Sequence, residues 1–595
     1  MWQRRVRIGR SNCGTGPCRF VDTWGDIARE MRKRQTEYCT YRPIKALICS
    51  WNVDACKPSD LRGTCDNLNF LEDVLKSSFT PDQPTSASAT HHSTDPPPSK
   101  QPSSSSNTSS KFPLNSRTPP TSTSTTARNA PDLIVFGFQE MIDLENKKLT
   151  ASELLSCCTV LLGSRKKAAG NNSSGGIGSG SGVGNSEKLS DSVSQVYRKW
   201  HDKLVATVRT FMPPDDPYVV IHTENLVGLF TCVFVKSSER AKMRDIAVTT
   251  VKTGMKGRYG NKGAILARLV IDDSSICFIN CHLAAGQKHV RQRNSDLIDI
   301  LEEKSGFPDP PERPTTTSNT SHHQSSSGRS KNQKEMVEMS SGVYVGGGNG
   351  SSISDHEICF LQGDLNYRID AQREDVIRAI AAGEYWKLLE FDQLSREKKL
   401  NPSCRLRAFN EPPIRFHPTY KYDPLVSLSL CLYIYIYMME IENVVGDFFF
   451  PRGTHMYDSS EKARVPAWCD RILYRTAIEE SSETEWSPGT IYIQQQQDER
   501  SGANPARPST TTTTTTTTAR PVNSLPVMTR MVESLDYRRY EVNISDHRPV
   551  SATFQILVKA FVPGLKRLVR DHALHKWSDH EAQIILDSRK YYSRL

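Results

Sequence analysis

Long polar stretches interrupt this chain and limit how much of it can pack into a core. They are rich in Ser, Thr, Pro, Gly or Gln and cover residues 81–131, 170–185, 308–352 and 481–526. Such compositions bury too little apolar surface to offset the chain entropy lost on folding, so we predict that they are disordered insertions. More than about 300 of the 595 residues remain, enough for one large domain with a sizeable core.

The most informative apolar run lies at 358–361 and predicts a buried strand. Gly363 ends this strand. Asp364 and Asn366 follow it, two residues apart, so in extended chain their side chains point the same way. A carboxylate and an amide that project together can bind and polarise a water. The simpler alternative is an Asx-turn after a strand.

Other apolar runs end in the same way. Strands are predicted at 44–50, 132–138, 275–280, 472–475 and 551–557, and helices at 194–211, 290–301, 373–382 and 386–394, which together indicate an α+β fold with a substantial sheet. The polar residues near strand ends are Asn52, Glu140, His282, Asp470, Asp546 and His547. Because such groups can converge on one edge of a sheet, we predict a site for a hard cation. Glu140 is the best single ligand candidate, since Mg²⁺ takes one or two carboxylates and keeps several waters.

Charge and cysteine content narrow the class of protein. The net charge of +10 and the pI near 8.8 favour an anionic partner, whether nucleic acid, acidic membrane or phosphorylated substrate. The basic N-terminus lacks the apolar stretch of a secretory signal. The fifteen cysteines show no disulfide spacing, so we expect reduced thiols in a cytoplasmic protein.

Eight short motifs occur in a characteristic order. They are WNV (51–53), FQE (138–140), GNKG (260–263), CHLAAG (281–286), GDLNYRI (363–369), PTYKYD (418–423), SSEKARVPAWCDRIL (459–473) and SDHRPV (545–550). Together they resemble the catalytic domain of inositol polyphosphate 5-phosphatases, within the wider endonuclease/exonuclease/phosphatase fold.

This resemblance implies a fold and a division into domains. The expected fold is a two-sheet β-sandwich flanked by helices, the four-layer DNase I-like arrangement. We expect an N-terminal extension at 1–40, a catalytic domain at 41–560 and a C-terminal extension at 561–595. The polar stretches and a further segment at 425–452 would interrupt the catalytic domain.

The resemblance also implies an activity and a cofactor. The expected reaction is Mg²⁺-dependent hydrolysis of the 5-phosphate of phosphatidylinositol polyphosphates resembling PI(4,5)P2, of soluble inositol polyphosphates, or of both. Glu140, helped by Asn52, would bind Mg²⁺, with Asp546 near the metal. Phosphomonoester hydrolysis needs charge neutralisation and in-line placement of water. It needs no cysteine nucleophile, so we expect Cys469 only to pack.

Five residues carry the implied chemistry. Asp364 and Asn366 would orient and activate the attacking water, with Asp364 the candidate general base. His547 would contact the scissile phosphate, held in one orientation by Asp470. His282 would donate to the same phosphate.

Further residues are implied to bind the rest of the substrate. For the 4-phosphate they are Tyr420, Lys421, Lys462 and Arg464, and for the ring or the 1-phosphate they are Asn261 and Lys262. Any one of these residues alone is explained as a solvated surface residue. The cluster as a whole points to an inositide, because a nuclease of the same fold would not need it. We therefore expect an inositide substrate, peripheral membrane contact and no nucleic acid, and leave the oligomeric state open.

One departure from the family pattern separates PTYKYD from the GT…YDSSEK segment that normally follows it. The apolar run that begins at 425 is too short to span a bilayer and has the composition of an aggregation-prone strand. Our hypothesis is that 425–452 is translated intron sequence. The alternative is a real insertion beside Lys421 and Lys462, able to disturb 4-phosphate binding or to face a membrane.

Two other functions compete with the 5-phosphatase interpretation. The first is another phosphoesterase of this fold, such as an apurinic endonuclease or a sphingomyelinase, against which PTYKYD and SEKAR argue. The second is a non-enzymatic inositide-binding module, against which the competent side chain at every proposed catalytic position argues.

Overall fold

The computed structural model describes residues 23–61, 65–77, 130–142, 183–254, 259–303, 306–308, 342–345, 348–423, 457–477 and 530–593. The predicted stretches at 81–131, 170–185, 425–452 and 481–526 lie outside them, apart from residues 130 and 131 and 183–185 at two margins. None of the described helices combines the length and apolar character needed to cross a membrane.

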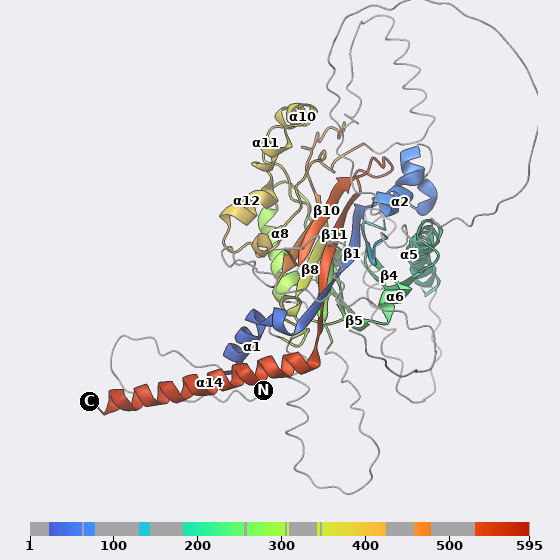
Figure 1. Ribbon diagram of the computed structural model, residues 1–595. Coiled ribbons are helices and arrows are strands. Elements are labelled where there is room, and N and C mark those ends of the chain that lie inside the picture. Colours follow the sequence, from blue (N-terminus) through green and yellow to red (C-terminus); the bar gives the residue numbers. More distant parts are fainter. Residues whose placement is uncertain are drawn as a thin grey trace, which may run out of the picture.

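Two sheets form the centre of the protein (Figure 1). The first sheet has the order β10-β11-β1-β2-β4-β3, and the second has the order β5-β6-β7-β8-β9. The strands are β1 (Cys39–Asn52), β2 (Leu133–Gln139), β3 (Tyr218–Leu226), β4 (Leu229–Lys236), β5 (Met243–Thr253), β6 (Tyr259–Ile271), β7 (Ser274–His282), β8 (Ile358–Asp364), β9 (Asp470–Thr476), β10 (Val532–Arg539) and β11 (Val550–Phe561). In each sheet one pair, β1 with β2 and β7 with β8, is parallel, and the other pairs are antiparallel.

Helices flank the two sheets, and some of them cover the outer faces (Figure 1). They are α1 (Thr23–Lys33), α2 (Cys65–Ser77), α5 (Val183–Phe211), α6 (Ser237–Arg240), α8 (Val290–Ile298), α10 (Arg373–Ala381), α11 (Tyr385–Leu389), α12 (Gln393–Leu400) and α14 (Pro563–Tyr592). The short turns are η1 (Gln35–Glu37), η2 (Pro58–Asp60), η3 (Asp299–Glu303), η4 (Ile353–Asp355) and η5 (Arg405–Ala408). The single helix predicted at 386–394 is wrong, because Asp392 accepts a hydrogen bond from the Ser395 N–H and starts α12 as a separate helix.

The buried side chains divide into layers that match the predicted four-layer sandwich. Residues such as Ile48, Phe278 and Phe360 fill the space between the two sheets. Another cluster joins the first sheet to α2 and α5, and a third joins the second sheet to α8, α12 and η5. The α+β prediction with two sheets flanked by helices is therefore confirmed. Strands β2, β4, β7 and β8 are buried along their whole length, which explains their continuous apolar runs.

One predicted insertion and the predicted C-terminal extension both contain residues that pack against other parts of the protein. Val343 and Tyr344, within the predicted stretch 308–352, are buried against Val270 and packed by Phe561. Helix α14 follows β11 and leads away from the end of the sandwich opposite α10 and α11 (Figure 1). Helix α1 packs against it, with an ion pair of 3.1 Å from Lys576 Nζ to Glu30 Oε1.

Candidate active site

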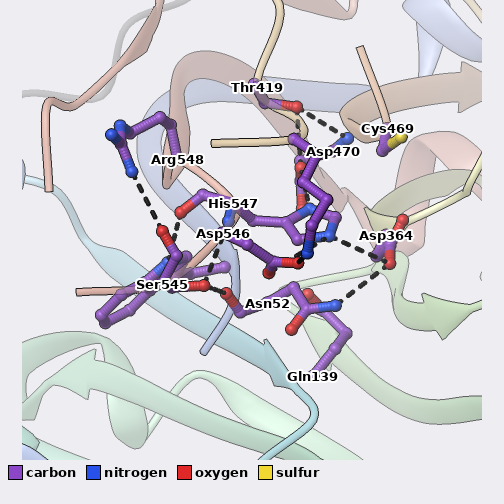
Figure 2. A network of polar contacts seen from close by, with 12 residues as sticks. Asn52, Gln139, Asp364, Thr419, Cys469, Asp470, Ser545, Asp546, His547 and Arg548 are labelled. Atoms are coloured by element: carbon purple, nitrogen blue, oxygen red, sulfur yellow. Dashed lines mark hydrogen bonds and ion pairs between the residues drawn. The ribbon is translucent and has the colours of Figure 1, made fainter. Parts of the chain in front are cut away.

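Both sheets contribute strand ends to one polar site. Asn52 ends β1, Glu140 directly follows β2, and His282, Asp364 and Asp470 lie side by side in the register of β7, β8 and β9. Asn52 Nδ2 donates to Asp364 Oδ2 at 3.2 Å, so one hydrogen bond joins the two sheets here. The convergence predicted from the strand ends is present, and Figure 2 shows Asn52, Asp364 and Asp470 of this site together with His547.

Asp364 and Asn366 meet through a tight turn rather than through extended chain. Asn366 has φ +57°, a left-handed conformation that Asn tolerates better than most residues. Its backbone N–H donates to Asp364 Oδ1 at 3.0 Å and its Nδ2 donates to Asp364 Oδ2 at 2.9 Å. The first of these bonds makes the Asx-turn that was the simpler interpretation, and the turn itself brings the two side chains together.

Gly363 is required immediately before this turn. It has φ +140°, and a Cβ added there would lie 2.0 Å from the backbone oxygen of Cys281 on the neighbouring strand β7. Only glycine permits that close approach. The residue therefore fixes how closely Asp364 lies to His282.

The carboxyl group of Asp364 is strongly biased towards its anion. Burial alone would raise its pKa, but the charge of His547, the hydrogen bond and charge of His282, and the charge of Lys262 hold the pKa well below the usual range. A carboxylate with such a pKa accepts hydrogen bonds well but is a weak base. The low pKa therefore favours a role for Asp364 in orienting a water over the predicted role of general base.

His547 forms a close pair with Asp470. Its Nδ1 lies 2.8 Å from Asp470 Oδ2, which also accepts a 2.7 Å hydrogen bond from Thr419 Oγ1. Burial opposes charge on the ring, but the charges of Asp470 and Asp364 and the hydrogen bond to Asp470 raise the pKa of His547 to about 10. Nε2 lies 4.0 Å from Asp364 Oδ2 and 3.9 Å from Asp546 Oδ1, so the Nε2 edge of the ring faces these two carboxyl groups (Figure 2).

Glu140 lies on the open side of the site with two basic neighbours. Its Oε1 is 3.3 Å from His282 Nε2 and 3.7 Å from Lys262 Nζ, and Lys262 also contacts the His282 ring. Although burial opposes this, the hydrogen bond and charge of His282 and the charge of Lys262 lower the pKa of Glu140 to about 2. This low pKa favours the ionised form of Glu140 near pH 7.

These side chains fit a divalent cation. Ligand atoms of Glu140, His282 and Asp364 lie within 4.8 Å of one another, as do those of Asp364, Asp470 and His547. The two carboxylates of the first group are the hard oxygen ligands that Mg²⁺ prefers. Asn52 Oδ1 accepts the backbone N–H of Asp54 at 3.1 Å and keeps a second lone pair.

Sequence reasoning missed Asp54. Its side chain is exposed, yet partial desolvation of the carboxyl group and the charges of Asp546 and Glu140 raise its pKa to about 6. The available signal was its spacing, since Asp54 follows Asn52 by two residues, as Asn366 follows Asp364.

Of the cations predicted to bind the 4-phosphate, Lys421 contacts this site directly. Lys421 Nζ lies 2.5 Å from Asp546 Oδ2, so Asp546 pairs with a lysine here as well as facing His547. Arg464 contacts Asp458 at 3.3 Å, and the backbone N–H of Asp458 donates to the Lys421 carbonyl. The side chain of Lys462 is exposed.

The remaining two predicted binding residues are Tyr420 and Asn261. The Tyr420 ring centre lies 4.6 Å from that of His547. Asn261 lies in β6, but its side chain is outside the part of the protein that the structure describes. Cys469 is fully buried, as expected for a packing residue.

The two halves of the split motif lie side by side. Tyr422 and Tyr457 form an antiparallel bridge, and the Tyr422 hydroxyl donates to that of Tyr457 at 2.7 Å. The backbone N–H of Ser459 donates to Asp423. The segments before and after 425–452 are therefore in contact with each other, as expected for two halves of one motif.

Comparison with known proteins places the chain in a family. A sequence model described as Endonuclease/Exonuclease/phosphatase family 2 matches residues 49–427 and 448–505. The chain belongs to this family. Within it, a probable inositol polyphosphate 5-phosphatase of Schizosaccharomyces pombe is 34% identical over 554 residues, covering 93% of this chain and 32% of the relative.

Synaptojanins are also similar to this family member. The Caenorhabditis elegans protein is 29% identical over 363 residues, covering 61% of this chain and 22% of the relative. Human synaptojanin-1 is 33% identical over 261 residues, covering 44% of this chain and 12% of the relative. The chain therefore spans about a third or less of these curated relatives.

A solved structure is also similar. It is the inositol polyphosphate 5-phosphatase domain of SpSynaptojanin in complex with inositol (1,4)-bisphosphate and calcium ion, with a TM-score of 0.49 and 20% identity, covering 96% of this chain and 100% of that one.

Proposed function

We propose that the protein is a Mg²⁺-dependent phosphatase that removes the 5-phosphate from phosphatidylinositol polyphosphates or soluble inositol polyphosphates. The observation that carries the proposal is the meeting of Glu140, Asp364 and His547 at one site, with Lys421 and Arg464 alongside. Support for the position of the scissile phosphate comes from the relatives, which are named inositol polyphosphate 5-phosphatase and synaptojanin.

Each side chain has a proposed role. Glu140, Asn52 and Asp546 would hold Mg²⁺, which supplies charge neutralisation for the phosphoryl group. Asp364 and Asn366 would place the water in line. His547 and His282 would contact the scissile phosphate. Asp470 would hold His547 in place.

The imidazolium of His547 is the feature best matched to a phosphoryl group. A phosphomonoester brings a charge of about −1.5 to −2 at pH 7 into a site that already holds the carboxyl groups of Asp364, Asp470 and Asp546. The protonated ring, with a pKa of about 10, offers a charge-assisted hydrogen bond from Nε2. Lys262, Lys421 and the metal would offset the remaining charge.

The cations beside the site are proposed to recognise the other phosphates. Lys421, Arg464, Lys462 and Tyr420 would bind the 4-phosphate, and Lys262 with Asn261 the ring or the 1-phosphate. In the structure Lys421 is paired with Asp546, so binding a phosphate there requires it to exchange that partner. Peripheral membrane contact and a cytoplasmic location belong to the same proposal.

The test is phosphate release from PI(4,5)P2 in vesicles, a soluble inositol trisphosphate and abasic DNA, each with and without Mg²⁺. We expect Mg²⁺-dependent release from one or both inositides and no cleavage of DNA. Asp364→Ala should lower the rate by several powers of ten, whereas Asp375→Ala, at an exposed carboxylate on α10, should not. DNA cleavage without phosphate release would favour the nuclease alternative, and inositide binding without release would favour a non-enzymatic module.

A further inference from the structure

Arg368 is a buried cation that belongs to none of the roles assigned above. It lies four residues after the end of β8, and its side chain is almost completely buried. Its backbone N–H donates to Gln393 Oε1 at 3.0 Å, and Gln393 Nε2 donates in turn to Asp370 Oδ1 at 2.7 Å. The backbone around Arg368 is thus fixed by α12.

The guanidinium of Arg368 holds both the backbone and the side chain of Asn366. Arg368 Nε donates to the Asn366 carbonyl at 3.1 Å, and an Nη donates to Asn366 Oδ1 at 2.5 Å. A guanidinium has donors only, so the oxygen end of the Asn366 amide must face Arg368. The nitrogen end must then face the other way.

That other direction is towards the catalytic carboxylate. Asn366 Nδ2 donates to Asp364 Oδ2 at 2.9 Å and to the Leu283 carbonyl at 3.2 Å. If the amide rotated by half a turn, its oxygen would face two acceptors and both hydrogen bonds would be lost. The contact with Arg368 therefore reinforces the amide orientation that Asp364 and the Leu283 carbonyl also require.

Arg368 also supports the other half of the site. Its guanidinium carbon lies 4.1 Å from the centre of the Tyr420 ring, within the range of a cation–π contact. The Tyr420 ring lies against His547, with the ring centres 4.6 Å apart. One side chain thus touches the residue beside Asp364 and the residue beside His547.

We propose that Arg368 is a positioning residue, which holds the Asn366 amide so that its nitrogen supports Asp364, the carboxylate proposed to place the attacking water. The proposal rests on the proposed phosphatase function. It requires both nitrogen positions of the guanidinium, because Nε and Nη contact different atoms of Asn366. Lysine offers a single point charge and cannot make both contacts in that geometry.

The test compares Arg368→Lys with Arg378→Lys, an exposed arginine on α10, in the full chain. For Arg368→Lys we expect kcat to fall by about 100-fold, the loss typical of a small misplacement of reacting groups, with KM changed less than about threefold and the melting temperature close to that of the parent. Arg378→Lys should match the parent in all three. A rise in KM with kcat unchanged would mean that Arg368 binds substrate, and would overturn the proposal.

A double-mutant cycle with Asn366→Ala separates this role from general support of the fold. If Arg368 acts through Asn366, Arg368→Lys should cost little further activity in the Asn366→Ala background, whereas independent effects would multiply. Multiplying losses would overturn the proposal.

A readout without turnover distinguishes failure of this proposal from failure of the phosphatase function. In protein labelled with ¹⁵N-asparagine, the Asn366 side-chain resonance, assigned by its loss in Asn366→Ala, should shift in Arg368→Lys and not in Arg378→Lys. An unshifted resonance would show that Arg368 does not orient the amide, whether or not the parent releases phosphate.

Discussion

Asp470→Asn should move the alkaline limit of activity towards neutral pH. Asp470 is fully buried, and Asn can keep its shape and its hydrogen bond with Thr419 while losing its charge. The charge matters because Asp470 raises the pKa of His547 against the effect of burial, aided by Asp364 and Asp546. Since we propose that protonated His547 binds the phosphate, the rate should fall once the ring loses its proton.

The size of the effect follows from the contact. The pKa of His547 rises from its ordinary 6.5 to about 10, which favours the imidazolium by about 5 kcal/mol at roughly 1.4 kcal/mol per unit. A single opposite charge at hydrogen-bond distance accounts for about 1–3 units. In Asp470→Asn the alkaline limb should therefore move from near pH 10 to between about pH 7 and 9. Loss of the carboxylate that orients the ring should also lower kcat, by up to about 10⁴-fold.

The same shift has a consequence for stability. Because the folded-state pKa of His547 lies above its unfolded-state value, the protonated ring stabilises the fold fully below about pH 6.5. That contribution is lost as pH rises towards about 10. In the variant the loss should be complete at a lower pH and should be smaller in total.

The assay is a pH–rate profile of phosphate release from a soluble inositol phosphate at saturating Mg²⁺, between pH 6 and 10.5, with urea unfolding at pH 6 and pH 9. Asp375→Asn, at an exposed carboxylate, is the matched control and should leave the profile unchanged. An Asp470→Asn profile that is lower overall but has its alkaline limb in the parental position would refute the reasoning, because the charge of Asp470 would then not govern the protonation of His547.

Three further predictions concern the metal, the substrate and the core. Glu140→Gln should raise the Mg²⁺ concentration for half-maximal activity by at least about tenfold, since a carboxylate ligand is lost; an unchanged Mg²⁺ titration would remove Glu140 from the metal site. Lys421→Met should raise KM more for substrates with a 4-phosphate than for those without one, since truncating a partner of a buried charge typically costs about 2–5 kcal/mol; equal effects on both would contradict 4-phosphate binding. Phe360→Ala should lower the free energy of unfolding by about 3–5 kcal/mol, because Phe360 is fully buried against Phe278 and Phe554; urea unfolding measures the change, and a loss under about 1 kcal/mol would contradict the packing.

The strands that stand out most clearly in the sequence are those buried on both faces. Strand β2 is buried at every position, so its sequence is a continuous apolar run that stands out between polar neighbours. Strand β10 was not predicted, because it lies at the edge of the first sheet and Val532 is its one buried residue, so its sequence contains no apolar run. Its strand conformation comes from pairing with β11, a partner eleven residues further along the chain that no local pattern reveals.

The sequence likewise reveals some residues of the candidate site and not others. Groups proposed to act directly, such as Glu140 and Asp364, stand out because a polar residue at the end of an apolar run is unusual. Arg368 and Thr419 act through Asn366 and Asp470, so their position relative to those groups is set only when separate elements pack together. Whether Asp364 is the general base also depended on its neighbours, since the depressed pKa comes from side chains on other strands.

The bridge between Tyr422 and Tyr457 holds together the two ends of the segment that separates the halves of the motif. The chain departs at Asp423 and returns at Tyr457, adjoining backbone positions beside Lys421. Closing a longer segment between two fixed ends adds only about 0.6 kcal/mol for each doubling of its length. We therefore expect that a change in the length of the segment between Asp423 and Tyr457 alters the free energy of unfolding little, and that both ends of the segment stay next to Lys421, which is proposed to bind the substrate.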